Sequence, residues 1–84
     1  MKWAVSWTAT AERDFGRLDL EARRRVQLGI NRYAAESVGD VLRLQNVTPA
    51  QYRLRVGKWR VRFRLDYDRR IMQILHVLRR DEAY

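Results

Sequence analysis

The stretch YRLRVGKWRVRFRLDY, Tyr52 to Tyr67, decides the fold that this sequence predicts. On both sides of Gly57-Lys58, apolar or aromatic residues alternate with arginines. A period of two is typical of a strand with one buried and one exposed face, and glycine supplies the positive φ that a two-residue hairpin turn requires. The stretch therefore predicts two antiparallel strands whose outer face carries the arginines Arg53, Arg55, Arg60, Arg62 and Arg64.

The predicted turn places these arginines opposite one another. A two-residue connection pairs Arg55 with Arg60 and Arg53 with Arg62, and like charges at such positions destabilise a sheet by a few tenths to about 1 kcal/mol per pair. Arginine also presents planar paired donors that match phosphate oxygens, and it stays charged at neutral pH. We interpret the face as a phosphate-binding surface. The alternative is a solvated outer face that is basic by chance.

The segments on either side of the hairpin complete an α+β pattern. Alternation predicts a first strand, Thr8 or Thr10 can cap a short helix, and Asp19 can cap a longer helix that ends near Ser37. The nearly continuous apolar run IMQILHVL predicts a strand in the middle of the sheet. The remaining segment is expected to be a connection with a short extended piece. The corresponding ranges are 2–8 for the first strand, 71–78 for the last, 39–51 for the connection and 41–44 for the extended piece.

The predicted architecture is a single domain, residues 1–84, with a small antiparallel sheet of about four strands and an N-terminal helical hairpin packed on one face. No segment reads as a membrane span or a signal peptide, and the chain contains no cysteine. These features lead us to expect a cytoplasmic protein.

Positive charge is concentrated in the C-terminal third of the chain. The net charge is +8, of which residues 52–84 contribute +6. A field of this sign and size attracts polyanions, nucleic acid above all. The last third of the chain is therefore where an anionic partner is expected to bind.

The whole pattern resembles the RelE/ParE toxin superfamily, in particular its RelE-type ribosome-dependent endoribonucleases. The resemblance is carried by a first strand that ends in W-T, a helix of the A-x-x-D-F type, the hairpin YRLRVGKWRVRF and the closing HVLRRDEAY. It implies a RelE-like fold and a type II toxin that cleaves messenger RNA on the ribosome without a metal or small-molecule cofactor. It also implies a cognate antitoxin as partner. A ParE-like inhibitor of DNA gyrase and a degenerate relative that only binds RNA are the alternatives.

The resemblance also assigns roles to individual residues. It implies catalytic roles for Arg53 before the turn, Arg60 after it, Arg80 after the last strand and the late Tyr84. Asp81 departs from the family pattern and can neutralise part of Arg80. The implied RNA-binding residues are Arg53, Arg55, Arg62, Arg64 and Arg79.

Acid–base groups are scarce in this predicted site. Cleavage would begin with attack of a 2′-hydroxyl on the adjacent phosphorus and would leave a 2′,3′-cyclic phosphate. Tyr84 can act as a partial base or stack on a nucleobase. His76 competes for the role of base, but its phase with Met72 and Ile74 on a predicted strand favours a packed, structural histidine.

Overall fold

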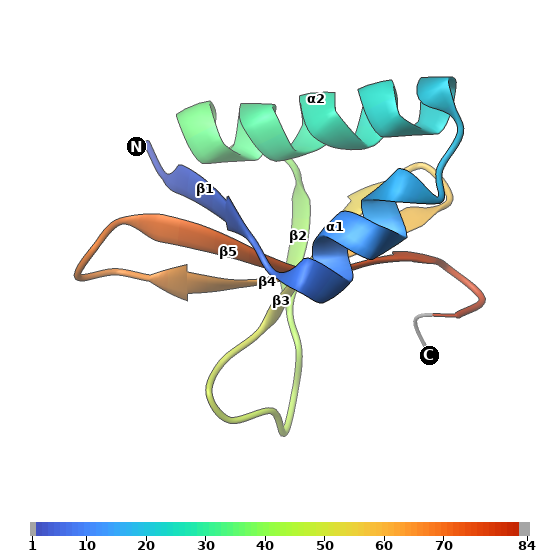
Figure 1. Cartoon of the computed structure of the whole chain (residues 1–84). Coiled ribbons are helices and arrows are strands. Elements are labelled where there is room, and N and C mark those ends of the chain that lie inside the picture. Colours follow the sequence, from blue (N-terminus) through green and yellow to red (C-terminus); the bar gives the residue numbers. More distant parts are fainter. Residues whose placement is uncertain (1, 83–84) are drawn as a thin grey trace.

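The computed structural model describes residues 2–82 and contains two helices and five strands (Figure 1). All five strands belong to one sheet. In chain order the elements are β1 (Ala4–Trp7), α1 (Ala9–Gly16), α2 (Leu20–Glu36), β2 (Asp40–Arg43), β3 (Tyr52–Val56), β4 (Trp59–Asp66) and β5 (Ile71–Arg79).

The strand order is β1-β5-β4-β3-β2, and every pair except β1–β5 is antiparallel. The α+β class is confirmed, as is the interior position of β5. The predicted sheet differs in two respects, because β2 is a fifth strand and β1 runs parallel to β5. The parallel pair arises because two helices and three strands separate its members, whereas a hairpin always joins antiparallel strands.

Both helices begin at the predicted caps. Thr8 Oγ1 accepts a hydrogen bond from the backbone N–H of Ala11 at 3.1 Å, and Asp19 Oδ1 accepts one from Ala22 at 2.8 Å. Each bond satisfies a backbone donor that the first turn of a helix leaves free. Helix α2 ends at Ser37, which adopts a left-handed conformation with φ of 57°.

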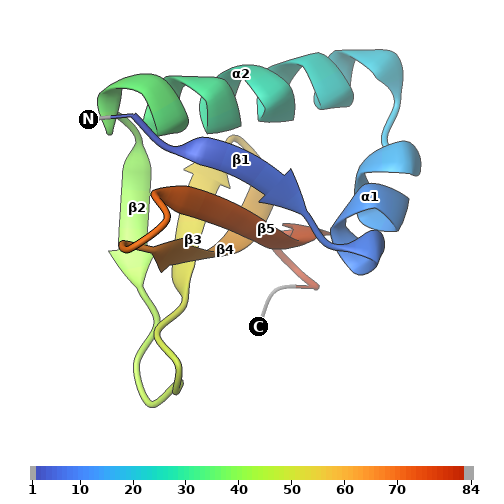
Figure 2. The ribbon, with the colours of Figure 1, turned by 60° about the vertical axis from the view of Figure 1, so that its left-hand side comes forward.

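The core lies between the helices and one face of the sheet. Figures 1 and 2 show α2 across the sheet and α1 beyond the end of β1. Helix α1 contacts β5 and β1, and α2 contacts β3. The largest fully buried side chains come from α2, β3, β4 and β5: Val26, Ile30, Leu54, Val61, Phe63, Met72 and Ile74.

A β-bulge interrupts the pairing of β4 with β5. Arg62 pairs with His76, but the next residue, Phe63, pairs with Ile74, so Leu75 is an extra residue in β5. The bulge reverses the alternation of β5 at this point. Beyond it, the residue that faces the core is Val77, which is 4% exposed.

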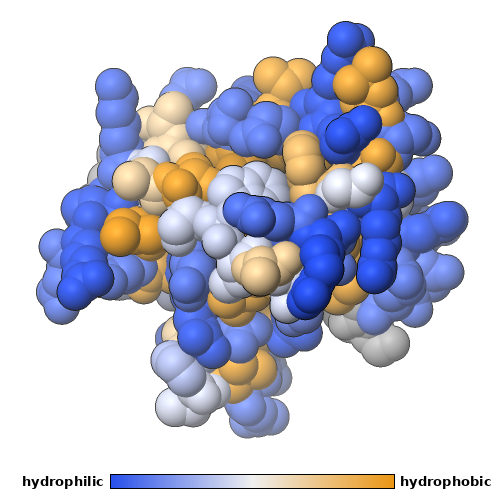
Figure 3. Space-filling model, in the orientation of Figure 1, coloured by the Kyte–Doolittle hydropathy of each residue, from blue (hydrophilic) through white to orange (hydrophobic). Residues whose placement is uncertain are grey.

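The surface in the view of Figure 3 is mostly hydrophilic and is broken by smaller apolar patches. The exposed large apolar side chains are spread over helix, strand and connecting segments: Leu20, Leu28, Val38, Leu42 and Tyr67. No helix in residues 2–82 combines the length and the apolar character that crossing a bilayer would demand.

Candidate nucleic-acid interface

The hairpin register confirms the predicted pairing of arginines. Arg53 lies opposite Arg62, and Arg55 lies opposite Arg60. Alternation places these four side chains and that of Arg64 on the face of the sheet opposite the buried Leu54, Val61 and Phe63. We call this surface, defined by Arg53, Arg55, Arg60, Arg62 and Arg64, the arginine face.

Arg60 is the most enclosed member of the arginine face. The residue is only 7% exposed, and its Nη1 donates to the carbonyl oxygens of Gly57 at 2.8 Å and Trp59 at 3.0 Å. These bonds tie the guanidinium to the turn between β3 and β4. Its charge is therefore fixed just beneath the surface, where it can act electrostatically on a bound anion.

Arg53 and Arg55 share one carboxylate, that of Asp40 on β2. The closest N–O separations are 3.8 Å for Arg53 and 4.0 Å for Arg55. Because these separations are long and the Asp40 side chain is 59% exposed, the pairs contribute little to stability. A single loosely held acid leaves the two guanidinium groups with a net positive charge.

Buried donors without partners occur on the arginine face, as they do at Arg23 on α2. Arg62 donates through Nη2 to Gln51 Oε1 at 3.1 Å, but the Nε groups of four of the five arginines are buried and have no hydrogen-bond partner in the described part of the chain. Buried polar groups normally have a partner. Because these atoms are shielded from solvent, an anion on this face would reach them only if the side chains moved. The four residues are Arg53, Arg60, Arg62 and Arg64.

The structure places the two arginines at the end of β5, Arg79 and Arg80, differently. The backbone N–H of Arg80 donates to the Lys58 carbonyl at 2.9 Å, which holds exposed Arg80 beside the hairpin turn. Arg79 pairs with Trp59 in the sheet register, on the side of the core residues, and its Nε lies 3.8 Å from Asp81. Arg79 is therefore not brought together with the arginine face. Tyr84 lies outside the described residues.

A polar cavity of about 280 Å³ opens on the arginine face, beside a pair of titratable side chains that the sequence did not predict. His76 lines it, and its Nδ1 lies 3.5 Å from Oδ2 of Asp14 on α1. The bulge at Leu75 turns His76 outward, so its predicted phase with Met72 was wrong. The cavity is lined by Thr8, Thr10, Gln51, Arg62, Arg64, Leu75 and His76.

A second cavity on this face, of about 310 Å³, also includes Arg64. It extends the concave surface toward the turn between β4 and β5, where the carboxylate of Asp66 accepts backbone hydrogen bonds from Asp68 and Arg69 at 3.1 Å. Arg64 therefore lies between two hollows that border the same row of positive charge. Within residues 2–82, no group of three His, Asp or Glu side chains is arranged to hold a metal ion.

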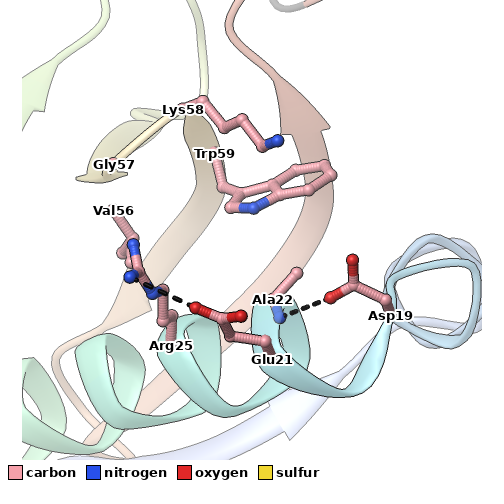
Figure 4. A pocket seen from close by; sticks show the side chains of 8 residues that line it. All are labelled: Asp19, Glu21, Ala22, Arg25, Val56, Gly57, Lys58 and Trp59. Carbon is pink, nitrogen blue, oxygen red and sulfur yellow. Dashed lines mark hydrogen bonds and ion pairs between the residues drawn. The ribbon is translucent and has the colours of Figure 1, made fainter.

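A different kind of cavity lies between the start of α2 and the β3–β4 turn (Figure 4). Its volume is about 370 Å³, and its lining includes two acids, Asp19 and Glu21, as well as the bases Arg25 and Lys58. Asp19 caps α2, and Glu21 pairs with Arg25 at 3.3 Å. The charges here balance one another, so this cavity is a weaker candidate for binding a polyanion than the arginine face.

Comparison with known proteins identifies the class to which this fold and basic face belong. The family model of the ParE toxin of type II toxin–antitoxin systems, parDE, matches residues 5–84, so the chain belongs to this toxin family within the RelE/ParE superfamily. No curated protein matches the chain.

Solved structures give the same fold. The RelE chain of the archaeal RelE–RelB complex from Pyrococcus horikoshii OT3 matches with a TM-score of 0.78 and 22% identity, over 95% of this chain and 97% of that one. The toxin–antitoxin complex RelBE2 from Mycobacterium tuberculosis matches with a TM-score of 0.73 and 25% identity, over 94% of this chain and 99% of that one. The RelB–RelE complex from Methanococcus jannaschii matches with a TM-score of 0.71 and 22% identity, over 93% of both chains.

Proposed function

We propose that this toxin is an endoribonuclease that cleaves messenger RNA on the ribosome and binds the RNA backbone on its arginine face. The opposed arginine pairs of the hairpin, in which Arg53 and Arg55 share one loosely held carboxylate, carry the proposal. A phosphodiester supplies acceptor oxygens and negative charge together, and arginine binds phosphate with charge-assisted hydrogen bonds. Opposed arginine pairs on a central hairpin are consistent with a surface selected for binding rather than for stability alone.

In this proposal the arginines hold and neutralise the reacting phosphate. Arg55, whose side chain is 54% exposed, and Arg80 contact the phosphate oxygens, while the buried Arg60 adds fixed positive charge from below. A 2′-hydroxyl attacks the adjacent phosphorus in line, and the 5′-oxygen leaves. Charge stabilisation of this preorganised kind is worth several kcal/mol in other enzymes. The ribosome positions the RNA for attack.

We also propose that a cognate antitoxin binds this toxin. Each of the three similar solved structures is a complex of a toxin with an antitoxin. Strand β2 lies at the edge of the sheet beside β3, where an extended peptide can add as a further strand. A peptide strand at this edge would be separated from β3 by β2, so its acidic side chains would have to reach across β2 to compete with RNA for Arg53 and Arg55.

Inhibition of DNA gyrase without RNA cleavage is the second candidate function. The matching family model is that of ParE, and Arg60 already donates to two backbone carbonyls, which limits its direct contact with a phosphate. The two functions make different demands on the arginine face. A nuclease needs the positive charge of this face next to the scissile phosphate, whereas a gyrase inhibitor that does not cleave RNA has no such requirement.

Brief expression of the toxin, followed by mapping of transcript 5′ ends and measurement of plasmid supercoiling, distinguishes the two functions. Cuts inside translated codons are expected, and they should disappear in an Arg55→Gln, Arg80→Gln double variant. Arg32→Gln on the exposed surface of α2 is the control for a lost positive charge and should cleave like the wild type. Changed supercoiling with intact transcripts would overturn the nuclease proposal in favour of gyrase inhibition.

A further inference from the structure

We propose that His76 is a catalytic residue of the toxin, the acid that protonates the departing 5′-oxygen, and that Asp14 positions it. This inference rests on the proposed nuclease function and adds the proton donor that the arginines cannot supply. Arginine holds its protons too tightly to transfer one near neutral pH, whereas histidine is the side chain best suited to this exchange.

The surroundings of Asp14 fix its carboxylate in place. Its side chain is only 13% exposed, and Oδ2 accepts a hydrogen bond from the backbone N–H of Val77 at 3.1 Å. The same oxygen lies 3.5 Å from Nδ1 of His76. A carboxylate anchored on one ring nitrogen sets the orientation of an imidazole and directs the other nitrogen, Nε2, away from it.

His76 lies on the same face of the sheet as the arginines. His76 is the direct cross-strand partner of Arg62 and lines the 280 Å³ cavity with Arg62 and Arg64. Its side chain is 41% exposed, and apart from the 3.5 Å approach of Asp14 no polar group within residues 2–82 is bonded to its ring. A histidine with only a packing role would be buried in the core, as its neighbours Ile74 and Val77 are.

The proton balance of the step is simple. The 2′-oxygen forms a bond to phosphorus as its proton passes to water, and the bond from phosphorus to the 5′-oxygen breaks. Nε2 of protonated His76 gives its proton to that oxygen, so the products are a 2′,3′-cyclic phosphate and a free 5′-hydroxyl. The neutral imidazole then regains a proton from solvent. Arg62 and Arg64, which line the cavity with His76, stay charged and add to the positive charge that Arg55, Arg60 and Arg80 place around the phosphate.

A messenger RNA with sulfur in place of the 5′-oxygen at the mapped cleavage position tests this role, because a thiolate leaves without being protonated. Single-turnover cleavage on ribosomes is measured for the oxygen and sulfur substrates. His76→Gln is expected to cleave the oxygen substrate about 10²-fold more slowly than the wild type. It should cleave the sulfur substrate within about threefold of the wild-type rate, because the acid is no longer needed.

Asp14→Asn examines the positioning role. Asparagine still offers an oxygen to the Val77 N–H but no charge to the imidazole, so a smaller loss with the same rescue by sulfur is expected. If His76→Gln cleaves the oxygen substrate like the wild type, or loses equal rate on both substrates, the inference is overturned and the nuclease stands. If the wild type cleaves neither substrate, both the nuclease proposal and this inference fail. Urea unfolding of each variant confirms that it is folded.

Discussion

Arg55 on β3 lies directly opposite Arg60 on β4, yet the two side chains have contrasting surroundings. The Arg55 side chain is 54% exposed, and its one ion pair within residues 2–82 is the 4.0 Å contact from Nη1 to Oδ2 of Asp40. Arg60 is 7% exposed, with Nη1 bonded to two carbonyls of the hairpin. One arginine of the pair is thus available to a ligand, and the other is built into the fold.

The first prediction concerns the stability of the hairpin. Arg60→Ala should lower the free energy of unfolding by about 1–3 kcal/mol, because it removes a buried side chain and the donor to Gly57 and Trp59. Arg55→Ala is the matched control and should change stability by less than about 0.5 kcal/mol. Urea unfolding followed by tryptophan fluorescence measures both variants.

This contrast affects how loss of toxicity in Arg60→Ala is interpreted. An inactive variant at this position combines a folding defect with any loss of chemistry. Equal unfolding free energies for Arg55→Ala and Arg60→Ala would contradict the structural role that we assign to Arg60.

The second prediction concerns Asp40, the carboxylate shared by Arg53 and Arg55. Asp40→Asn should strengthen the binding of single-stranded RNA several-fold at low salt and make the affinity fall more steeply with salt, because the arginines lose a competing negative charge. Fluorescence anisotropy across a salt series measures this change. Asp68→Asn, in the β4–β5 turn, makes the same change of charge and should have a smaller effect. Equal gains from both variants would show that only net charge matters.

Much of the arginine face could be predicted from the sequence because a two-residue turn fixes the register of a hairpin. Gly57-Lys58 alone determined that Arg55 would lie opposite Arg60. The burial of Arg60 could not be predicted, because the alternating pattern assigns every arginine on that face to solvent. Its burial accompanies the hydrogen bonds from Nη1 to the carbonyl oxygens of Gly57 and Trp59, which the alternating pattern does not reveal.

Tertiary contacts account for the remaining differences between prediction and structure. The pair Asp14–His76 joins α1 to β5, and no local spacing links residues so far apart in sequence. The bulge at Leu75 also reversed the phase on which the prediction for His76 depended. No glycine marks this bulge, so the apolar run around it favoured an uninterrupted strand.

The third prediction concerns the contact between α2 and β3. A Cβ atom on Gly29 would lie 2.7 Å from Cγ2 of Val56, a stiff branched side chain. Gly29→Ala should therefore lower stability by about 1 kcal/mol, because overpacking outweighs the gain in helix propensity. Adding Val56→Ala should remove that penalty. Gly16→Ala is the control, with no atom within 4 Å of the added methyl, and should be neutral or stabilising. Stabilisation by Gly29→Ala alone would contradict the close packing.

The fourth prediction concerns alkaline pH. Burial, with a smaller contribution from the nearby Tyr52, raises the pKa of Tyr33 above its usual value of about 10. The folded protein therefore retains this proton at a pH where the unfolded chain has lost it. The contribution to stability is fully present below the unfolded pKa and is lost as pH rises through the folded pKa.

Tyr33→Phe tests this linkage, because phenylalanine has no proton to lose. Urea unfolding of the wild type and the variant at several values between about pH 9 and 11 should show the steeper loss of stability in the wild type, so the difference between the two narrows or reverses as pH rises. The phenolate absorbance of the folded wild type, titrated over the same range, should place the midpoint of Tyr33 above that of a free tyrosine. Parallel stability curves for the two proteins would mean that the ring of Tyr33 ionises equally well in the folded and unfolded states.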